Sequence, residues 1–527
     1  MTGPPPVAGC SAQTTHLTLA VAGYQSIDPA LNAGCITFSA NPSSSDTAEY
    51  LVVPQAAVGT PGLSAPFELQ GGGAATAASV PALVSTGASS ARTPLAFDAF
   101  LRGVARTRAY AGPPSLPARV PGTIAMQPGR PVPGDLRVFK VCATLTCSSF
   151  ANVVARVKAV GTHIAVYVDT LAPVAGLDSA DLDTLKQVFD ARLFPLDSAA
   201  FGTVSDIDAD SVVTVLMTGV VNKLVTAGQC NTNGFVAGFF FAGDLDPVFS
   251  SQFNHGEVFY SVVADPDSTL SCAHSRAEVK GLTPVTFTHE FQHMISFVQH
   301  VVIHGGQSEE GWLDEGLSKY AEEIAGRSFL PGDPAAFSNY AIGDVYDAYQ
   351  YLLAPGSSPL MIPQDNGTLA EIGASWLFTR YLVDQFGDSL AHRLVQSSHT
   401  GATNVATQTG QPFDQSVTRW ALANWVSDLP GFTAPPELRY TTWHFRGTFA
   451  SLHSQAPTTF PLAYPLVPVA SDGAAVSMTG TLSSGSGVYA RVLQPPGGAA
   501  FTLRLSGPGG ADIASAIVPR VNVIRIR

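Results

Sequence analysis

Both ends of the chain consist of short runs in which apolar and polar residues alternate. Residues 16–21 show this pattern near the N-terminus, and residues 488–493 and 501–505 show it near the C-terminus. A period of two is typical of strands that are buried on one face. The pattern predicts an N-terminal β domain over residues 1–75 and a C-terminal β domain over residues 448–527.

The long segment between the two ends predicts a linker followed by one large domain of mixed α/β class. Residues 76–136 are rich in glycine, alanine, serine and proline, with a short helix expected at residues 95–108. Residues 137–447 then form the large domain, which we expect to be α/β over residues 137–300 and mainly helical over residues 301–447. It is marked by two β-rich runs, a helix between them and a helix opened by a capping box: residues 162–169, 212–217, 181–193 and 368–387.

The central feature of the large domain is the run His289-Glu290-Phe291-Gln292-His293, which lies in a segment with the apolar spacing of a buried helix. We expect this helix to begin at Pro284, with Thr283 as its N-cap. Residues four apart share one helix face, so His289 and His293 can bind the same metal ion. Glu290 lies about 100° around the helix, where its carboxylate can reach an activated water molecule. This is the pattern of a zinc hydrolase.

Catalytic zinc usually takes three protein ligands, so the two histidines need a partner. A third histidine six residues after His293, as metzincins have, is excluded because that position is Gln299. The run WLDEGLSKYAEE that follows predicts a second helix, and Glu315 within it is the best third ligand. Glu309 and Glu310 are the alternatives, but they precede the helix, where a ligand is positioned less precisely.

The chain resembles the glutamate-zincin metallopeptidases, in which an HExxH helix is followed by a helix that carries a glutamate ligand. It is most similar to the hyicolysin family of secreted bacterial metallopeptidases over residues 138–388, through the runs HEFQHMI, WLDEGLSKYAEE and GASWLFTRYLVDQFGD. The resemblance implies a glutamate-zincin catalytic domain with a mixed sheet, an active-site helix and a helical subdomain. It also implies zinc as the cofactor, with His289, His293 and Glu315 as ligands and Glu290 as the general base.

Two more carboxylates on the second helix are candidates for orienting the ligand histidines. A metal-binding imidazole normally donates its other N–H to a carboxylate or a carbonyl, which fixes the tautomer. Glu322 lies seven residues after Glu315 and therefore on the same helix face. Asp314 stands where the related metallopeptidases commonly carry asparagine.

These residues predict an extracellular zinc endopeptidase that acts on proteins or peptides. Glu290 would take a proton from the attacking water and pass it to the leaving amine. The oxyanion needs a further donor, usually tyrosine or histidine. The downstream candidates are Tyr346, Tyr349, Tyr351, His392 and His399.

Two other functions stay open. A zinc aminopeptidase would need a carboxylate-rich strand that binds a free amine, and the run from Asn254 to Glu257 is a distant counterpart of that strand. A non-catalytic binding or adhesion protein would hold the metal for structure, but it would not require the carboxylate of Glu290. Cleavage of a peptide with a blocked N-terminus distinguishes these functions.

The strand-like run from residue 257 to residue 263 is the expected edge of the substrate cleft. In glutamate-zincins the strand before the active-site helix commonly forms this upper edge. An edge strand offers unpaired N–H and C=O groups to an extended peptide and needs no free terminus. We therefore expect Glu257, Phe259 and Ser261 to lie along the substrate.

A structural calcium ion is a further expectation. Asp206, Asp208 and Asp210 alternate along the chain as the ligands of a calcium loop do. Ser211 and Met217 stand where an EF-hand has glycine and glutamate, so a turn before a strand is the other interpretation.

Composition restricts the partners. The 527 residues include 40 acidic and 27 basic ones, which gives a net charge of −13 and no basic surface for nucleic acid. No apolar run reaches the ~18 residues of a transmembrane helix. We therefore expect protein or peptide substrates.

The six cysteines indicate an oxidising compartment. They fall into three sequence-local pairs without the CxxC spacing of a metal site, so we expect disulfides: Cys10 with Cys35, Cys142 with Cys147 and Cys230 with Cys272. The connectivity stays open, since six cysteines allow 15 pairings, although we expect a bridge between Cys230 and Cys272. The first residues lack the basic and apolar segments of a signal peptide. We expect a secreted protein in processed form, with a surface lipoprotein as the alternative.

Overall fold

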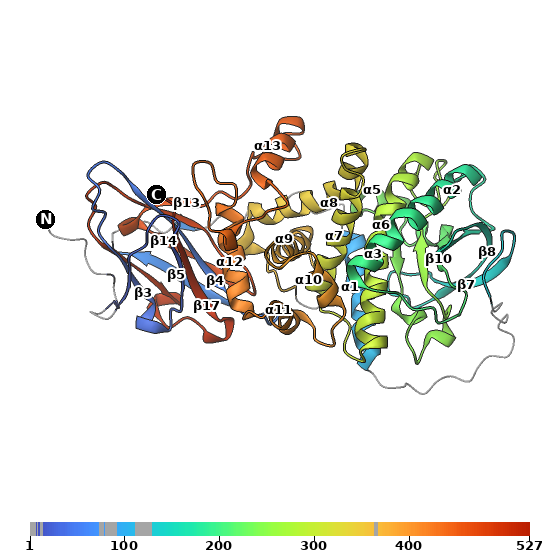
Figure 1. Cartoon of the computed structure of the whole chain (residues 1–527), viewed down its shortest axis with the longest axis horizontal. Coiled ribbons are helices and arrows are strands. Elements are labelled where there is room, and N and C mark those ends of the chain that lie inside the picture. Colours follow the sequence, from blue (N-terminus) through green and yellow to red (C-terminus); the bar gives the residue numbers. More distant parts are fainter. Residues whose placement is uncertain are drawn as a thin grey trace.

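The structure is a computed structural model that describes residues 7, 9–10, 14–72, 78–79, 92–110, 129–362 and 367–527. Figure 1 shows three parts along its longest axis: a β-sandwich, a helical part and a part built on a mixed sheet. This architecture agrees with the expected α+β class. The helical part lies between the two sheet-containing parts.

Strands from both ends of the chain form the sandwich. The N-terminal strands are β1 (Thr15–Leu17), β2 (Tyr24–Ile27), β3 (Cys35–Phe38), β4 (Ala48–Ala56), β5 (Ser64–Gly71) and β6 (Ala78–Ser79). The C-terminal strands are β13 (Val469–Asp472), β14 (Ser477–Ser483), β15 (Ala490–Gln494), β16 (Phe501–Ser506) and β17 (Pro519–Arg525). They pair in the orders β1-β3-β16-β5-β14-β6 and β13-β15-β4-β17-β2.

The prediction of two separate β domains is therefore wrong. Strands β16 and β17 each lie between two N-terminal strands, so neither end of the chain has a sheet of its own. The core between the sheets is also shared, since Phe38 stacks on Phe501 with ring centroids 4.5 Å apart. The inward-facing apolar side chains of the N-terminal strands thus pack together with those of the C-terminal strands.

The mixed sheet carries the second part of the fold. Its strands are β7 (Leu136–Cys142), β8 (Phe150–Val160), β9 (Ile164–Asp169), β10 (Val213–Met217), β11 (Gly238–Phe240) and β12 (Val258–Ser261). The order is β11-β12-β10-β9-β8-β7, in which β9, β10 and β12 run parallel. The expected strands at residues 162–169 and 212–217 are thus present as β9 and β10.

The expected edge strand is an interior one. Strand β12, which contains Phe259 and Ser261, pairs with β10 on one side and with β11 on the other. Strand β11 is the edge, and it reaches β12 closely because Gly238 has no side chain: a Cβ there would lie 2.6 Å from the carbonyl oxygen of Tyr260. The residues around β12 do not reveal this insertion, because β11 lies earlier in the chain.

The helices of this part cover the sheet and connect it to the helical part. They are α1 (Arg92–Tyr110), α2 (Ser179–Val188), α3 (Phe194–Phe201), α4 (Gly219–Asn222), α5 (Ala227–Asn233) and α6 (Arg276–Phe297). A π-helical turn, Phe189–Leu193, joins α2 to α3, and another, Val298–Ile303, continues α6. Helix α6 packs on the sheet, where Phe287 contacts Phe259 edge-to-face at 5.2 Å.

Helix α6 begins earlier than predicted. Its N-cap is Ser275, whose side chain accepts from the N–H of Glu278 while the Glu278 carboxylate bonds back to the N–H of Ser275. This reciprocal capping box satisfies two end groups and starts the helix at Arg276. Pro284, the expected first residue, lies inside the helix.

The helical part consists of α7 (Gly311–Arg327), α8 (Pro334–Leu353), α9 (Leu369–Phe386), α10 (Ser389–Val395), α11 (Gly401–Thr409), α12 (Phe413–Val426) and α13 (Phe445–Gln455). Helix α9 opens with the expected capping box of Thr368 and Glu371. One continuous apolar core runs from the mixed sheet through these helices to Leu51 and Val53 of the sandwich. Helices α6 and α7 are therefore held rigidly against each other.

Each of the three sequence-local cysteine pairs forms a disulfide, including the expected Cys230–Cys272 bridge, and the described part of the chain contains no free cysteine: Cys10–Cys35, Cys142–Cys147 and Cys230–Cys272. Among the described helices, none combines the length and the apolar character needed to span a membrane.

Candidate active site

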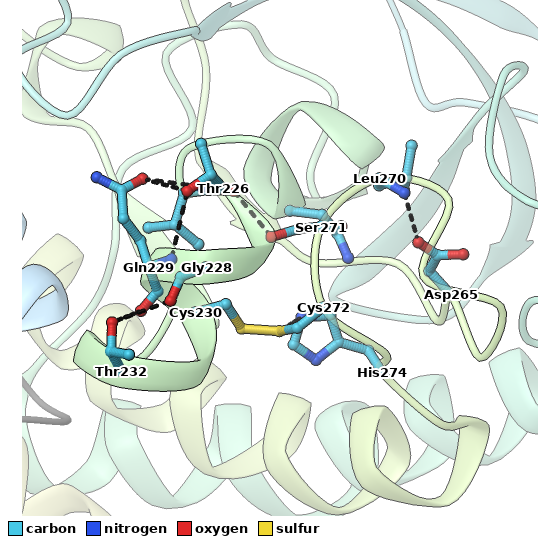
Figure 2. The surroundings of a disulfide bond; sticks show 12 residues. Thr226, Gly228, Gln229, Cys230, Thr232, Asp265, Leu270, Ser271, Cys272 and His274 are labelled. Atoms are coloured by element: carbon cyan, nitrogen blue, oxygen red, sulfur yellow. Dashed lines mark hydrogen bonds between the residues drawn. A yellow bond between two sulfur atoms is a disulfide. The ribbon is translucent and has the colours of Figure 1, made fainter.

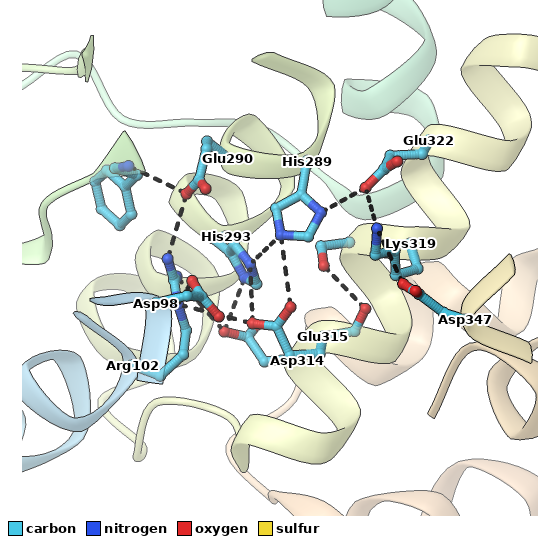
Figure 3. Close-up of polar contacts among 12 residues, drawn as sticks. Asp98, Arg102, His289, Glu290, His293, Asp314, Glu315, Lys319, Glu322 and Asp347 are labelled. Carbon is cyan, nitrogen blue, oxygen red and sulfur yellow. Dashed lines mark hydrogen bonds and ion pairs between the residues drawn. The ribbon is translucent and has the colours of Figure 1, made fainter. Parts of the chain in front are cut away.

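Helix α6 presents His289 and His293 on one face, as their spacing predicts. Their Nε2 atoms lie 3.1 Å apart and point toward the same place (Figure 3). His293 is buried and His289 is 14% exposed, so the pair remains accessible from one side only. The rigid backbone of a buried helix fixes both imidazoles.

Helix α7 brings Glu315 to these two nitrogens. Its Oε2 atom lies 3.5 Å from Nε2 of His289, and its Oε1 atom lies 3.4 Å from Nε2 of His293. Helix α7 packs closely against α9 because the residue after Glu315 is Gly316, where a Cβ would lie 2.4 Å from the Thr379 hydroxyl on α9. The Glu-Gly pair thus allows α7 to carry a ligand group while packing against α9.

The geometry of the three side chains fits a zinc ion. Tetrahedral zinc with bonds of about 2.0–2.2 Å holds its ligand atoms roughly 3.3–3.6 Å apart, close to the observed separations. The Oε1 atom of Glu315 is buried and accepts no hydrogen bond, although a buried carboxylate oxygen normally has a partner. A cation between Glu315 and the two imidazoles would satisfy it.

Both imidazoles are oriented through their other ring nitrogen. The Glu322 carboxylate lies 2.7 Å from Nδ1 of His289, and the Asp314 carboxylate lies 2.9 Å from Nδ1 of His293. Lys319 lies 3.1 Å from the Glu322 carboxylate and keeps it in place. The structure thus brings both predicted orienting residues to the nitrogens that face away from Glu315, which leaves Nε2 of each ring for a metal.

The buried charged groups of the cluster change one another's pKa. Burial alone would lower the pKa of His289, but Glu315 and Glu322 raise this pKa well above its ordinary value. Burial would likewise raise the pKa of Glu315, but His293 and His289 lower it well below its ordinary value. The cluster therefore favours a positive charge beside these carboxylates. A divalent cation can supply that charge, and its binding would displace a proton from His289.

Glu290 lies beside the cluster without joining the three candidate ligands. Its Oε2 atom accepts a hydrogen bond of 3.1 Å from the N–H of Phe240 on β11, and it pairs with the Arg102 guanidinium at 3.2 Å. The carboxylate is thus held between the edge strand and the candidate ligands. This is the place where a general base would meet a water molecule.

Two site residues were not found from the sequence. Helix α1 matches the expected helix in the linker, but its Asp98 and Arg102 reach the cluster (Figure 3). Arg102 lies 188 residues before Glu290, and Asp98 hydrogen-bonds to the Glu315 carboxylate. The only local signal was the spacing of an acid and a base four residues apart, which is common on helix surfaces.

The alternative third ligands point elsewhere. The Glu309 carboxylate accepts hydrogen bonds from the N–H of Gly401, at 2.6 Å, and from the Asn404 side chain, at 2.9 Å. The Glu310 carboxylate accepts one of 2.8 Å from the Trp312 indole. Both therefore support the loop before α7.

Two of the five candidates for oxyanion stabilisation have partners other than the candidate ligands. Tyr349 bonds to the backbone of Leu462, and Tyr351 is buried against Trp420. Among the described residues, no hydrogen bond or ion pair joins any of the five to the candidate ligands or to Glu290. The set is Tyr346, Tyr349, Tyr351, His392 and His399.

Glu257 and the aspartate run form a separate acidic group. Ligand atoms of Asp206, Asp208 and Asp210 lie within 4.8 Å of one another. Arg137 pairs with Asp208 at 3.4 Å and with Asp210 at 4.0 Å, so the protein itself supplies a counter-charge. Glu257 accepts a hydrogen bond from the Ile207 N–H of the same loop and takes no part in the cluster on α6 and α7.

The Cys230–Cys272 disulfide closes a second group with metal-binding residue types (Figure 2). His274 lies beside it, with Nε2 3.5 Å from the Cys272 sulfur, and packs against the Phe235 ring. Because both sulfurs are bonded to each other, neither is a thiolate that can bind a metal. The bridge instead ties α5 to the segment before α6.

Comparison with known proteins gives a relationship of limited extent. The chain is 27% identical over 213 residues to the neutral metalloprotease ShpI of Staphylococcus hyicus, a match that covers 40% of this chain and 43% of that protein. The chain thus matches less than half the length of this relative. No family model matches the chain. The similarity supports a metallopeptidase relationship and no narrower assignment.

We expect the Glu322→Gln variant to bind zinc more weakly. The amide keeps the volume but loses the charge that orients His289, and changes of this kind typically lower metal affinity by about 10–100-fold. Competition with a chromogenic chelator measures the effect. Glu437→Gln is the matched control, because Glu437 accepts a hydrogen bond from Tyr24 in another part of the molecule. Equal zinc affinities for the two variants would contradict an orienting role for Glu322.

Proposed function

We propose that the chain is a zinc-dependent endopeptidase. The observation that carries this proposal is the convergence of two Nε2 atoms and the Oε1 atom of Glu315, which accepts no hydrogen bond, with Glu290 beside them. His289, His293 and Glu315 would hold the zinc, which supplies a Lewis acid for the scissile carbonyl and for water. The similarity to a neutral metalloprotease supports peptide hydrolysis as the reaction.

Glu290 is the general base in this proposal. Its carboxylate takes the proton of the attacking water and passes it to the leaving amine. The N–H of Phe240, which bonds to Glu290, holds the carboxylate near the edge strand. Glu322 and Asp314 keep the two imidazoles in the tautomer that leaves Nε2 free.

Strand β11 replaces β12 as the proposed substrate-binding edge. It pairs with β12 on one side only, and the Phe240 N–H points away from β12 toward Glu290. An extended peptide could pair along this edge through its backbone and would need no free terminus. This favours endopeptidase action over aminopeptidase action, in which a carboxylate must bind the substrate amine. Glu257, the expected counterpart of that carboxylate, lies with the Asp206–Asp210 loop instead.

A fluorescence-quenched peptide with an acetylated N-terminus tests the proposal. We expect the zinc-loaded protein to cleave it at an internal bond, and we expect a chelator to stop the cleavage. An amino-acid nitroanilide with a free amine serves as the comparison substrate. Hydrolysis of the nitroanilide alone would favour an aminopeptidase, and zinc binding without hydrolysis of either substrate would favour a non-catalytic protein.

We also propose an extracellular setting, supported by the three disulfides. Mass spectrometry of the non-reduced protein from an oxidising compartment should show no free thiols, and digestion should release linked peptides for all three pairs. The same sample after reduction is the control. Six reduced cysteines in the native sample would contradict this setting.

A further inference from the structure

Helix α1 places a guanidinium in the middle of the candidate site. Arg102 is buried, and its nitrogens lie 3.2 Å from Glu290, 3.9 Å from Asp314 and 4.0 Å from Glu315 (Figure 3). On the same helix, Asp98 bonds to Arg102 at 3.2 Å and also hydrogen-bonds to the Glu315 carboxylate. One helix therefore engages both the proposed base and a proposed ligand.

These contacts oppose catalysis. The Arg102 guanidinium and the Phe240 N–H both contact Oε2 of Glu290, so this oxygen is not free to bind the attacking water. A guanidinium near Glu315 also repels a divalent cation at the candidate ligands, because both are positive. The Asp98 carboxyl group also hydrogen-bonds to Glu315 and so occupies part of a proposed ligand.

Helix α1 also covers the proposed substrate edge. Phe97 packs edge-to-face on Phe239 of β11, with ring centroids 5.1 Å apart. The cavity between α1 and α7 measures about 10 Å³, which is enough for about one water molecule. It is lined by Leu95, Asp98, Arg102, Glu315, Ile362 and Ile372. This cavity beside Glu315 is too small for a peptide side chain.

Helix α1 contributes one face to the core. Its buried apolar residues, Phe97, Leu101 and Ala105, repeat every four positions and belong to the same apolar core as α6 and α7, whereas Ala96 is exposed. Proteins can open locally at a single element with less free energy than global unfolding requires.

We propose that α1 is an inhibitory segment of this chain, which occupies the site until it is displaced. This inference rests on the proposed peptidase function. Arg102 contacts the proposed base itself, and Asp98 contacts a proposed ligand. A residue that assists the reaction would instead face the substrate carbonyl. The inhibitory and assisting roles predict opposite effects of removing Arg102.

The test compares the full chain with its Arg102→Ala and Asp98→Ala variants. If the open state is populated at about 0.1–10%, removing the contact should raise kcat/KM for the quenched peptide by roughly 10- to 1,000-fold. Hydrogen exchange of the amides at residues 95–106 should also become faster in both variants. Ala96→Glu, at the exposed position of α1, is the control and should change neither quantity.

Each outcome is decisive. Hydrolysis by the wild-type chain that neither variant raises would overturn the inhibitory role and leave the proposed function intact. A loss of hydrolysis in zinc-loaded Arg102→Ala would assign Arg102 an assisting role instead. If the zinc-loaded wild type and both variants all fail to cleave, the proposed function fails, and the inhibitory role fails with it. If Arg102→Ala does not fold, kcat/KM and hydrogen exchange of Asp98→Ala test the same contact.

Discussion

The Glu290→Gln variant should lose most peptide hydrolysis while it keeps its zinc. The amide has the shape of the carboxylate but cannot accept the proton of the attacking water, and loss of a general base typically lowers the rate by ~10²–10⁴-fold. Glu290 is not among the three candidate ligands, so metal content should stay near that of the wild type. The measurements are kcat/KM for the quenched peptide and zinc analysis of the same samples.

Two comparisons sharpen this test. Glu437→Gln makes the same chemical change at a hydrogen-bonded glutamate outside the site and should leave kcat/KM unchanged. The substitution at Glu290 should also be made in the Arg102→Ala background, where inhibition by α1 cannot mask a loss of rate. Activity within a few fold of the parent in both backgrounds would remove Glu290 from the mechanism.

The part of the site that is local in sequence could be predicted. The spacing of His289 and His293 determines their position on one helix face, and the predicted second helix brings Glu315 to them. The position of Glu322 follows from the same helix periodicity, whereas Asp314 is a candidate only through the resemblance to related metallopeptidases. All of these side chains lie on two helices, and the helical period of 3.6 residues predicts which residues share a face of each helix.

The contacts between distant segments could not be predicted. Arg102 meets Glu290 across 188 residues, and no pattern near either residue records that contact. The paired strands of the sandwich are separated by an even longer stretch of sequence, since Phe38 near one end of the chain stacks on Phe501 near the other. The edge position of β11 could not be predicted for the same reason. The alternation of apolar and polar residues in a strand shows which face is buried, but it does not show which strands lie next to it.

The Glu315→Ala variant should lose zinc from the site, and with it hydrolysis. Catalytic zinc usually has three protein ligands, so the variant would keep two imidazoles and no carboxylate. We expect zinc content to fall from about one ion per chain to a small fraction of that after dialysis against a weak chelator.

Glu310→Ala is the matched control for this loss, because Glu310 is a neighbouring glutamate that bonds to Trp312 and does not face the imidazoles. Its zinc content should match that of the wild type. The opposite result, with zinc retained in Glu315→Ala and lost in Glu310→Ala, would show that the loop before α7 supplies the third ligand. Because α7 is fixed by close packing of Gly316 against α9, the structure favours Glu315 over a ligand that requires this loop to move.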